Sequence, residues 1–291
     1  MRTWIAAALT AVLSLVCAGT AQAERIVTIG GDVTEIVFAL GEGKRIVGVD
    51  QTSMYPYDAT KGLPQVGYMR NLSAEGILSL KPDLVLAGAN AGPPAVLEQL
   101  GDAKIKLVKV PGEESMAGVL AKIDVIAGAL DVADKAKALK ASVERRMAAV
   151  DAGLKSVGRG TKAMFILSQG PGGTMAAGTK TAADAMIDLA HGTNVAKGFE
   201  GYKPLTPESA VALAPDVIIV AQHALDMMGG LDQFRQRPEV VVTPAARKNR
   251  IVVMDALLLL GFGPRTPEAV AMLARTFHPE AKIDTAEVKA N

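Results

Sequence analysis

The sequence contains a single cysteine, Cys17, and it lies near the N-terminus. An apolar run from Trp4 to Val16 follows the positive start Met1-Arg2, and Ala21-Gln22-Ala23 supplies small residues at a cleavage point. This pattern is typical of a secretory signal peptide, and the run is too short to span a bilayer. We expect cleavage after Ala23. The mature chain then has neither thiol nor disulfide and must rely on its core for stability.

The alternative reading of Cys17 is a lipoprotein anchor. It is disfavoured because Val16, directly before the cysteine, is bulky where a lipoprotein site needs a small residue. A cleaved signal peptide places the mature protein in the bacterial periplasm. Beyond the N-terminal run, no stretch reaches the roughly 18 apolar residues that mark a transmembrane helix, so we expect a soluble mature protein. We also expect it to be a monomer.

An excess of one charge is also missing. The chain has 31 Lys and Arg against 30 Asp and Glu, which gives a formal net charge of +1. Nucleic-acid-binding surfaces usually show a basic excess, so the composition argues against a nucleic-acid partner.

Catalytic signatures are lacking as well. No His-x-x-x-His or Gly-x-Ser-x-Gly spacing occurs, and Gly30-Gly31 lacks the spacing of a dinucleotide fingerprint. Nothing in the sequence brings serine, histidine and aspartate side chains together. A Rossmann-type enzyme is therefore an unsupported alternative, and the sequence favours a binding protein that is not an enzyme.

What the chain does contain is a regular alternation of short apolar runs and amphipathic segments. The predicted strands are 26–29, 46–49, 84–87, 105–108, 163–167, 217–220 and 251–254. β-Branched runs that alternate with helices indicate parallel sheets with helices on their faces. The predicted helices include 33–40, with Asp32 as its N-cap, 181–189, and a last helix over about 267–275.

Residues 115–158 break this alternation, because they are rich in Ala, Lys, Glu and Asp and contain no proline. Between residues 131 and 154 apolar residues recur at spacings of three and four, which predicts one helix about 36 Å long. Such a helix in mid-chain suits a connector between two lobes, although an ordinary surface helix is the alternative. The predicted division is a signal peptide over 1–23, an N-terminal α/β lobe over 24–114, a connecting helical region over 115–158 and a C-terminal α/β lobe over 159–291.

The clearest internal signal is a repeat at a constant offset of 133 positions. Residues 72–75 lead through 80–83 into one strand, and residues 205–208 lead through 213–216 into another. In each copy a Ser or Thr is a natural helix N-cap, and a glutamate two residues later suits the positive end of the helix dipole. Glu75 and Glu208 are therefore either plain helix-start residues or a matched pair that grips one symmetric partner through salt bridges.

Four stretches carry a resemblance to a known family: 66–70 (Val-Gly-Tyr-Met-Arg), 72–83, 201–205 (Gly-Tyr-Lys-Pro-Leu) and 260–265 (Leu-Gly-Phe-Gly-Pro-Arg). Over essentially the whole mature chain the sequence resembles bacterial periplasmic haem-binding proteins of haemin ABC importers. These belong to a wider group that also binds ferric siderophores and cobalamin. The resemblance implies an α/β fold of two Rossmann-like lobes with mainly parallel sheets, joined by one long α-helix. It also implies that Glu75 and Glu208 dock onto arginines of the dimeric permease, the protein's only link to the inner membrane.

By the same resemblance, Tyr68 is the predicted ligand of the ferric iron of haem. Tyrosinate is a recognised axial ligand, but a phenol with a pKa of about 10 needs help to lose its proton. The iron and a neighbouring cation both stabilise the phenolate. Arg70 is predicted to donate to that oxygen from the same side of an extended segment. The alternative is that Tyr68 is a turn aromatic packed against its neighbours.

The remaining candidates are weaker. His223 follows the strand 217–220, at the sheet edge where α/β proteins bind ligands, and is the candidate for a second iron ligand or a propionate contact. Tyr202 is expected to stack on the porphyrin or to seal the lobe, and Lys203 to meet a propionate. Arg265 is a candidate for a propionate or permease contact. Residues 92–94 and Met227-Met228 are expected to line the pocket, and His191 and His278 are expected to be either structural or solvated.

The closest rival is a protein of the same architecture that binds a ferric siderophore or cobalamin. Siderophore sites usually contain several arginines for anionic chelates, whereas haem needs one strong ligand and a flat apolar slot. The two tyrosine stretches, 66–70 and 201–205, favour haem. Because the second copy of the repeat reproduces the tyrosine only loosely, we expect an asymmetric cleft with the iron held mainly by the N-terminal lobe.

Overall fold

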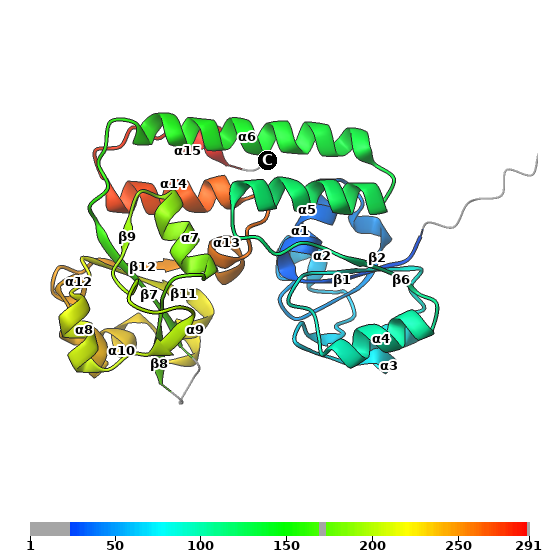
Figure 1. The fold of residues 1–291 in the computed structure, drawn as a ribbon, viewed down its shortest axis with the longest axis horizontal. Coiled ribbons are helices and arrows are strands. Elements are labelled where there is room, and N and C mark those ends of the chain that lie inside the picture. The colour runs from blue at the N-terminus through cyan, green and yellow to red at the C-terminus, as the bar shows by residue number, and fades with distance from the viewer. Residues whose placement is uncertain (1–23, 169–172, 290–291) are drawn as a thin grey trace, which may run out of the picture.

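The structure is a computed structural model, and it describes residues 24–168 and 173–289. Figure 1 shows two lobes side by side beneath a shared layer of helices. The predicted signal peptide and Cys17 lie outside the described residues, as does most of the loop 170–173.

The N-terminal lobe is built on a four-stranded parallel sheet with strand order β2-β1-β5-β6. Its strands are β1 (Ile26–Ile29), β2 (Ile46–Val49), β5 (Leu84–Ala87) and β6 (Lys106–Lys109). Its helices are α1 (Gly31–Ala39), the 3-10 helix η1 (Gly43–Arg45), α2 (Tyr57–Thr60), α3 (Ala74–Ser79) and α4 (Pro94–Asp102). A small separate hairpin is formed by β3 (Gly67–Tyr68) and β4 (Asn71–Leu72).

The C-terminal lobe has a mixed sheet with strand order β10-β8-β7-β11-β12, and β9 pairs with β7. Its strands are β7 (Lys162–Ser168), β8 (Thr174–Ala177), β9 (Thr193–Asn194), β10 (Tyr202–Pro204), β11 (Val217–Ala221) and β12 (Ile251–Met254). Its helices are α7 (Ala182–Leu189), α8 (Pro207–Leu213), α9 (Gln222–Met227), α10 (Leu231–Arg235), α11 (Pro238–Val241) and α12 (Pro244–Arg247). Strands β7, β11 and β12 are parallel to one another, whereas β8 runs antiparallel to both of its neighbours, β7 and β10.

A layer of helices covers both lobes. It contains α5 (Met116–Ala129), α6 (Ala133–Leu154), α13 (Ala256–Leu260), α14 (Thr266–Phe277) and α15 (Thr285–Val288). In Figure 1 the long α6 lies above α5 on the N-terminal side and above α14 on the C-terminal side. Val143 and Val150 of α6 belong to the same buried apolar cluster as Ile36 of α1 and Ala274 of α14. The core is therefore continuous from one lobe to the other.

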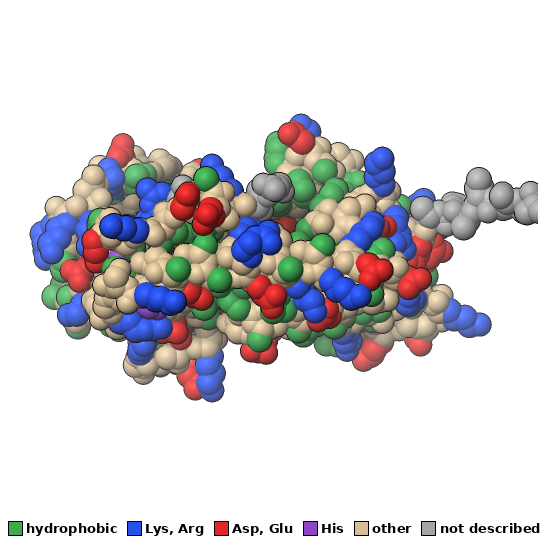
Figure 2. Space-filling view, turned by 90° about the horizontal axis from the view of Figure 1, so that it is seen from above, with side chains coloured by type: hydrophobic (Ala, Val, Ile, Leu, Met, Phe, Trp, Pro, Cys, Tyr) green, Lys and Arg blue, Asp and Glu red, His purple; other side chains and the backbone are tan. Residues whose placement is uncertain are grey.

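The outer face of this layer is polar. Figure 2, seen from above α6, shows Lys and Arg side chains interspersed with Asp and Glu rather than gathered by sign. Among the described helices, none combines the length and apolarity needed to cross a bilayer.

The predicted fold class is confirmed, with local corrections. The helix expected over 33–40 begins earlier, at Gly31, because Gly30 at φ 111° supplies the cap position; Asp32 is not the N-cap but forms an ion pair with Lys122. The strand expected over 105–108 lies one residue later. The helix expected from residue 131 begins at Ala133, since Asp131 is in the left-handed region at φ 59° and separates α5 from α6. The final short helix α15 was not predicted.

The internal repeat is a repeat of structure. Ser73 and Thr206 both cap their helices, with their side-chain oxygens 3.2 Å from the backbone nitrogens that donate to them. Both helices lead into a residue in the left-handed region, Lys81 at φ 47° and its counterpart Ala214 at φ 44°. The strands that follow, β5 and β11, are then central in their sheets. The two lobes thus use one helix–turn–strand unit at equivalent places.

Candidate ligand-binding cleft

The candidate residues lie beyond the carboxyl ends of parallel strands in both lobes. The 66–72 segment is hydrogen-bonded to the segment that follows β2 and to the loop that follows β5, and His223 follows β11 directly. In open α/β sheets this edge is where ligands bind. The topology therefore supplies one ligand-binding edge from each lobe.

The hairpin that carries Tyr68 is fixed to this edge by its backbone. The Gln51 N–H donates to the Gly67 carbonyl at 2.9 Å, and the Leu72 N–H donates to the Gly92 carbonyl at 3.0 Å. Gly67 has φ +105°, and a Cβ there would lie 3.0 Å from a backbone oxygen of β4, so glycine is required. The Tyr68 residue remains 41% exposed. A rigid base thus presents an accessible phenol.

The structure differs from the expected arrangement of Tyr68 and Arg70. The prediction placed both on one extended segment, but Tyr68 is the last residue of β3 and Arg70 lies in the two-residue turn before β4. Arg70 is not part of a strand, so the alternation of side chains along a strand cannot place it on the same side as Tyr68. Its side chain is exposed at the tip of the hairpin.

Arg70 acts electrostatically on Tyr202, a residue of the other lobe. Burial raises the pKa of the Tyr202 phenol above its ordinary value, and the positive charge of Arg70 partly offsets that rise. Glu114, in the segment between β6 and α5, raises the pKa of Tyr202 further. Three groups from separate parts of the chain thus share one electrostatic environment. Glu114 was missed from the sequence, although its place soon after the end of β6 was a usable signal.

Tyr202 and Lys203 are neighbours on β10, and their side chains have different surroundings. Tyr202 is 36% exposed, and the strand pairs with β8, where Tyr202 lies opposite Ala177. The Lys203 ammonium lies 5.2 Å from the centroid of the Phe199 ring. Successive side chains of a strand point to opposite faces, so the two residues are presented differently to any ligand.

Two further predicted cleft elements have clear positions. His223 is exposed in the first turn of α9, and Met227 of the same helix is 57% exposed. In Figure 1, α9 lies on the side of its lobe that faces the N-terminal lobe.

Pro94 lines a cavity of about 340 Å³ together with Leu97 of α4 and Lys109 of β6. Among the described residues there is no group of three or more His, Cys, Asp or Glu placed to hold a metal ion.

The predicted docking residues are matched in structure. Glu75 and Glu208 are both exposed in the first turns of the equivalent helices α3 and α8. Hydrogen bonding at the helix start, from its own backbone N–H and from Thr206, lowers the pKa of Glu208. Figure 1 shows α3 and α8 low in their lobes, away from α6.

Arg265 is engaged inside the protein. Its Nη2 donates to Glu35 Oε2 at 2.9 Å, and its guanidinium carbon stacks 3.5 Å from the centroid of the Tyr55 ring. With 11% of its side chain exposed, Arg265 binds the C-terminal part of the chain to the N-terminal lobe. The 260–265 stretch thus lies at a junction between the C-terminal part of the chain and the N-terminal lobe. His191 and His278 are also internal partners, with 3.2 Å between His278 Nε2 and the His191 carbonyl oxygen.

The comparisons identify the class of protein. Residues 26–258 match the family model described as periplasmic binding protein, and the chain belongs to this family. The family model and the structural neighbours are those of substrate-binding transport proteins. The prediction of a binding protein rather than an enzyme is therefore confirmed.

Two solved structures are very similar. The periplasmic heme-binding protein RhuT from Roseiflexus sp. RS-1, in its apo form, is 41% identical with a TM-score of 0.86, covering 90% of this chain and 100% of that chain. The periplasmic heme-binding protein BhuT, in complex with two hemes, is 43% identical with a TM-score of 0.82, covering 88% and 98%. The predicted resemblance to periplasmic haem-binding proteins is confirmed by these neighbours.

Sequence relatives widen the group. An uncharacterized ABC transporter substrate-binding lipoprotein of Bacillus subtilis is 29% identical over 266 residues, 89% of this chain and 81% of the relative. A cobalamin-binding protein of Halobacterium salinarum is 27% identical over 264 residues, 88% of this chain and 70% of the relative. The chain is thus a periplasmic substrate-binding protein of the haem, siderophore and cobalamin group.

Proposed function

We propose that this protein captures ferric haem between its two lobes and delivers it to an ABC permease. The observation that carries the proposal is the position of Tyr68, an exposed phenol on a rigid hairpin at the ligand-binding edge. The likeness to haem-binding structures at 41% and 43% identity supports haem over other ligands of the group.

In this proposal Tyr68 binds the iron of the cargo as a phenolate. Arg70 stabilises negative charge in the cleft, both on the phenolate and on propionates of the porphyrin. Tyr202 contacts the macrocycle from the other lobe, Lys203 meets a propionate, and His223 is the candidate for a second iron ligand. The cleft is asymmetric because only the N-terminal lobe presents a tyrosine on a hairpin.

Delivery is assigned to the two matched glutamates. Glu75 and Glu208 each project from the start of an exposed helix, one on each lobe. A dimeric permease with an arginine at each equivalent position would engage both at once. We further propose that the chain is exported through a signal peptide cleaved after Ala23, and that the mature protein is a monomer.

A spectral titration of the purified mature chain with haemin tests the proposal. We expect a shifted Soret band with a phenolate-to-iron charge-transfer band in the wild type. Tyr68→Ala should lose the charge-transfer band, whereas Tyr57→Ala, which removes a 68% exposed tyrosine outside the proposed site, should not. A Tyr68→Ala spectrum identical to the wild type would remove Tyr68 from the role of ligand.

The second candidate ligand is cobalamin, favoured by the cobalamin-binding relatives. The same protein is therefore titrated with cobalamin. Saturable binding of cobalamin with no response to micromolar haemin would overturn the haem proposal and leave the transport class intact.

A further inference from the structure

The turn that follows β2 carries a cluster of exposed apolar side chains that the proposed function does not use. Met54, Tyr55 and Tyr57 are 44%, 37% and 68% exposed. Single apolar residues on a surface are ordinary, but three within four positions of one turn point to a contact surface. Because β2 is a strand of a parallel sheet, the turn at its carboxyl end lies at the ligand-binding edge of the N-terminal lobe.

A buried polar network fixes the base of this turn. The Gly30 N–H and the Ser53 hydroxyl donate to Asp50 Oδ1, each at 2.8 Å. The Thr52 N–H and hydroxyl donate to Asp50 Oδ2 at 2.9 Å and 2.7 Å. Four donors therefore compensate a fully buried carboxylate, and loss of any of them would leave part of a buried charge unsatisfied. The residue that follows Ser53, Met54, is thus presented from a rigid base.

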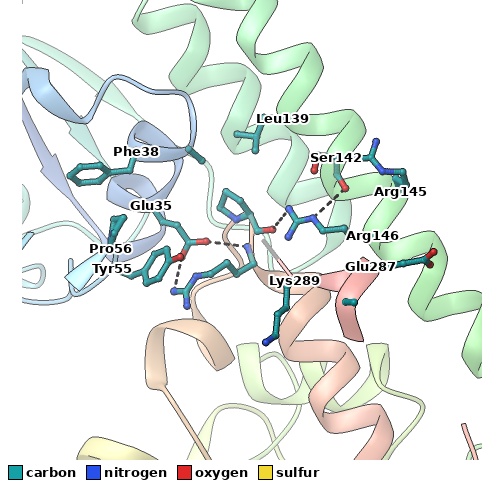
Figure 3. Close-up of a pocket in the computed structure, with 14 residues that line it drawn as sticks. Glu35, Phe38, Tyr55, Pro56, Leu139, Ser142, Arg145, Arg146, Glu287 and Lys289 are labelled. Atoms are coloured by element: carbon teal, nitrogen blue, oxygen red, sulfur yellow. Dashed lines mark hydrogen bonds and ion pairs between the residues drawn. The ribbon is translucent and has the colours of Figure 1, made fainter. Parts of the chain in front are cut away.

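Both tyrosines of the turn already have partners within the protein. The ring of Tyr55 stacks on the Arg265 guanidinium, and the Lys61 ammonium lies 5.4 Å from the centroid of the Tyr57 ring. Figure 3 shows Tyr55 on the wall of a cavity of about 460 Å³, at the junction of the lobes with α6. Met54 differs, since within residues 24–168 and 173–289 it packs against none of the buried apolar clusters. Its side chain is therefore free to contact a ligand.

Met54 lies in the chain between two fixed points. Three residues before it, the Gln51 N–H donates to the Gly67 carbonyl at 2.9 Å, in the hairpin of β3 and β4. Directly after it, the chain makes the stacking contact with Arg265 at the junction of the lobes. Three residues span at most about 11 Å, so Met54 lies close to the hairpin that carries Tyr68. A macrocycle bound to Tyr68 between the lobes is therefore within reach of Met54.

Exposed methionines are few in this protein. Among the described residues there are three, Met54, Met227 and Met272. Two of them belong to the ligand-binding edges of opposite lobes, because Met54 follows β2 and Met227 lies in α9, directly after β11. The third lies in α14 of the helical layer. Methionine is unbranched and polarizable and adapts to irregular apolar surfaces, so each lobe presents one adaptable apolar side chain at its ligand-binding edge.

We propose that Met54 is a ligand contact of the N-terminal lobe, paired with Met227 of the C-terminal lobe, and that both side chains pack against the ring of a flat tetrapyrrole. This inference rests on the proposed capture of haem between the lobes. Thioethers make favourable contacts with aromatic rings, and here they act as apolar contacts while the iron stays bound to Tyr68. Because methionine side chains adapt their shape, the pair favours flat macrocycles as a class rather than one pattern of ring substituents.

Oxidative footprinting of the mature chain tests this contact. Gallium(III) protoporphyrin IX is the probe, because it is flat like haem and its metal does not react with peroxide. Hydrogen peroxide transfers an oxygen atom to the sulfur of an exposed methionine, giving the sulfoxide and water, and mass spectrometry of peptides measures the rate at each site. Bound porphyrin should slow the oxidation of Met54 and Met227 by about fivefold or more, because susceptibility follows exposure. Met272 is the internal reference, and its rate should not change.

Substitutions provide the second measurement. Met54→Ser should weaken binding of the same porphyrin about five- to tenfold, since it removes part of an apolar contact. Met54→Leu keeps the apolar surface and should bind nearly as tightly as the wild type, and Met272→Ser is the matched control on α14. A saturated porphyrin complex in which Met54 is oxidised at the rate of the free protein, or wild-type affinity in Met54→Ser, would overturn this inference and leave the proposed function standing. Failure of the wild type to bind the porphyrin at all would overturn both.

Discussion

Lys122 of α5 and Asp32 of α1 form an ion pair inside the protein, with 2.5 Å between Nζ and Oδ2. The same ammonium donates to the carbonyl oxygens of Gly261 at 3.1 Å and Phe262 at 3.3 Å. One lysine side chain, 4% exposed, therefore connects the N-terminal lobe, the helical layer and the segment that leads into α14.

This relationship gives the first prediction. Lys122→Met should lower the free energy of unfolding by about 3 kcal/mol, because it leaves Asp32 without its counter-ion and frees two carbonyl groups. Guanidinium-induced unfolding measures the change. The double variant Lys122→Met with Asp32→Leu should recover part of the loss, since no unpaired charge remains. A single variant as stable as the wild type would contradict the bridging role.

The second prediction concerns acid pH. Hydrogen bonding from Lys135, aided by Arg45, lowers the pKa of Glu42 below its ordinary value of 4.5. A carboxyl group whose pKa is lower in the folded state contributes stability above its unfolded pKa, and that contribution disappears as the pH falls through the folded pKa. Glu42→Gln should therefore destabilise the protein at pH 7 and have little effect at the lowest pH at which the fold persists. Thermal melts at several pH values check this.

Glu35 is predicted to affect the pH dependence of stability in the opposite direction to Glu42. Burial raises its pKa above 4.5, although Arg265 opposes the rise. Between the unfolded pKa and this raised folded pKa, the folded state holds the proton more tightly, so stability falls as the pH rises through that window. Glu35→Gln should flatten the decline in the same set of melts. If stability fell with rising pH as steeply in Glu35→Gln as in the wild type, the fall would be caused by groups other than Glu35.

A fourth prediction tests whether the two lobes approach each other in solution. Because the charge of Arg70 lowers the pKa of Tyr202, Arg70→Ala should raise the pH at which the Tyr202 phenolate forms. Ultraviolet difference titration follows the phenolate, and subtraction of a Tyr202→Phe variant isolates this tyrosine. Arg235→Ala, a change in α10, serves as the charge control. Identical titration curves with and without Arg70 would place the two residues too far apart to interact.

The fifth prediction separates ligand binding from docking to the permease. Reversing both charges, with Glu75→Lys and Glu208→Lys, should abolish haem delivery to the permease but leave the haemin titration unchanged, because both side chains are exposed on α3 and α8. Reconstituted transport and haemin spectra on the same protein provide the two measurements. Loss of haemin binding in this variant would contradict the division of roles. Asp58→Lys with Glu280→Lys, at exposed positions elsewhere, is the matched control.

The fold was largely predictable because its signals are local. The segments that form β1, β5 and β11 are short and apolar, which is typical of buried strands. Ser73 and Thr206 are residue types that are strongly preferred as helix N-caps, so the helix starts were visible in the sequence. The exact helix boundary at Asp131 was not predictable. A single residue in the left-handed region separates α5 from α6, but the apolar periodicity of the sequence continues almost unbroken across it.

The site was less predictable because its contacts are distant in sequence. Arg265 resembled a ligand-binding cation, but its partner Glu35 lies 230 positions away in the other lobe. Nothing near either residue indicates that pairing. Likewise, only the folded chain brings Arg70 within reach of Tyr202, and the hairpin turn, rather than strand alternation, determines where Arg70 lies.

The apolar cluster that runs from α1 through α6 to α14 has a mechanical consequence. Prising the lobes apart at the helical layer would bring its buried side chains into water, at a cost that grows with the area exposed. The continuous core therefore favours one fixed relative position of the two lobes. If the protein delivers its ligand as proposed, docking to the permease must supply the free energy that moves the lobes apart.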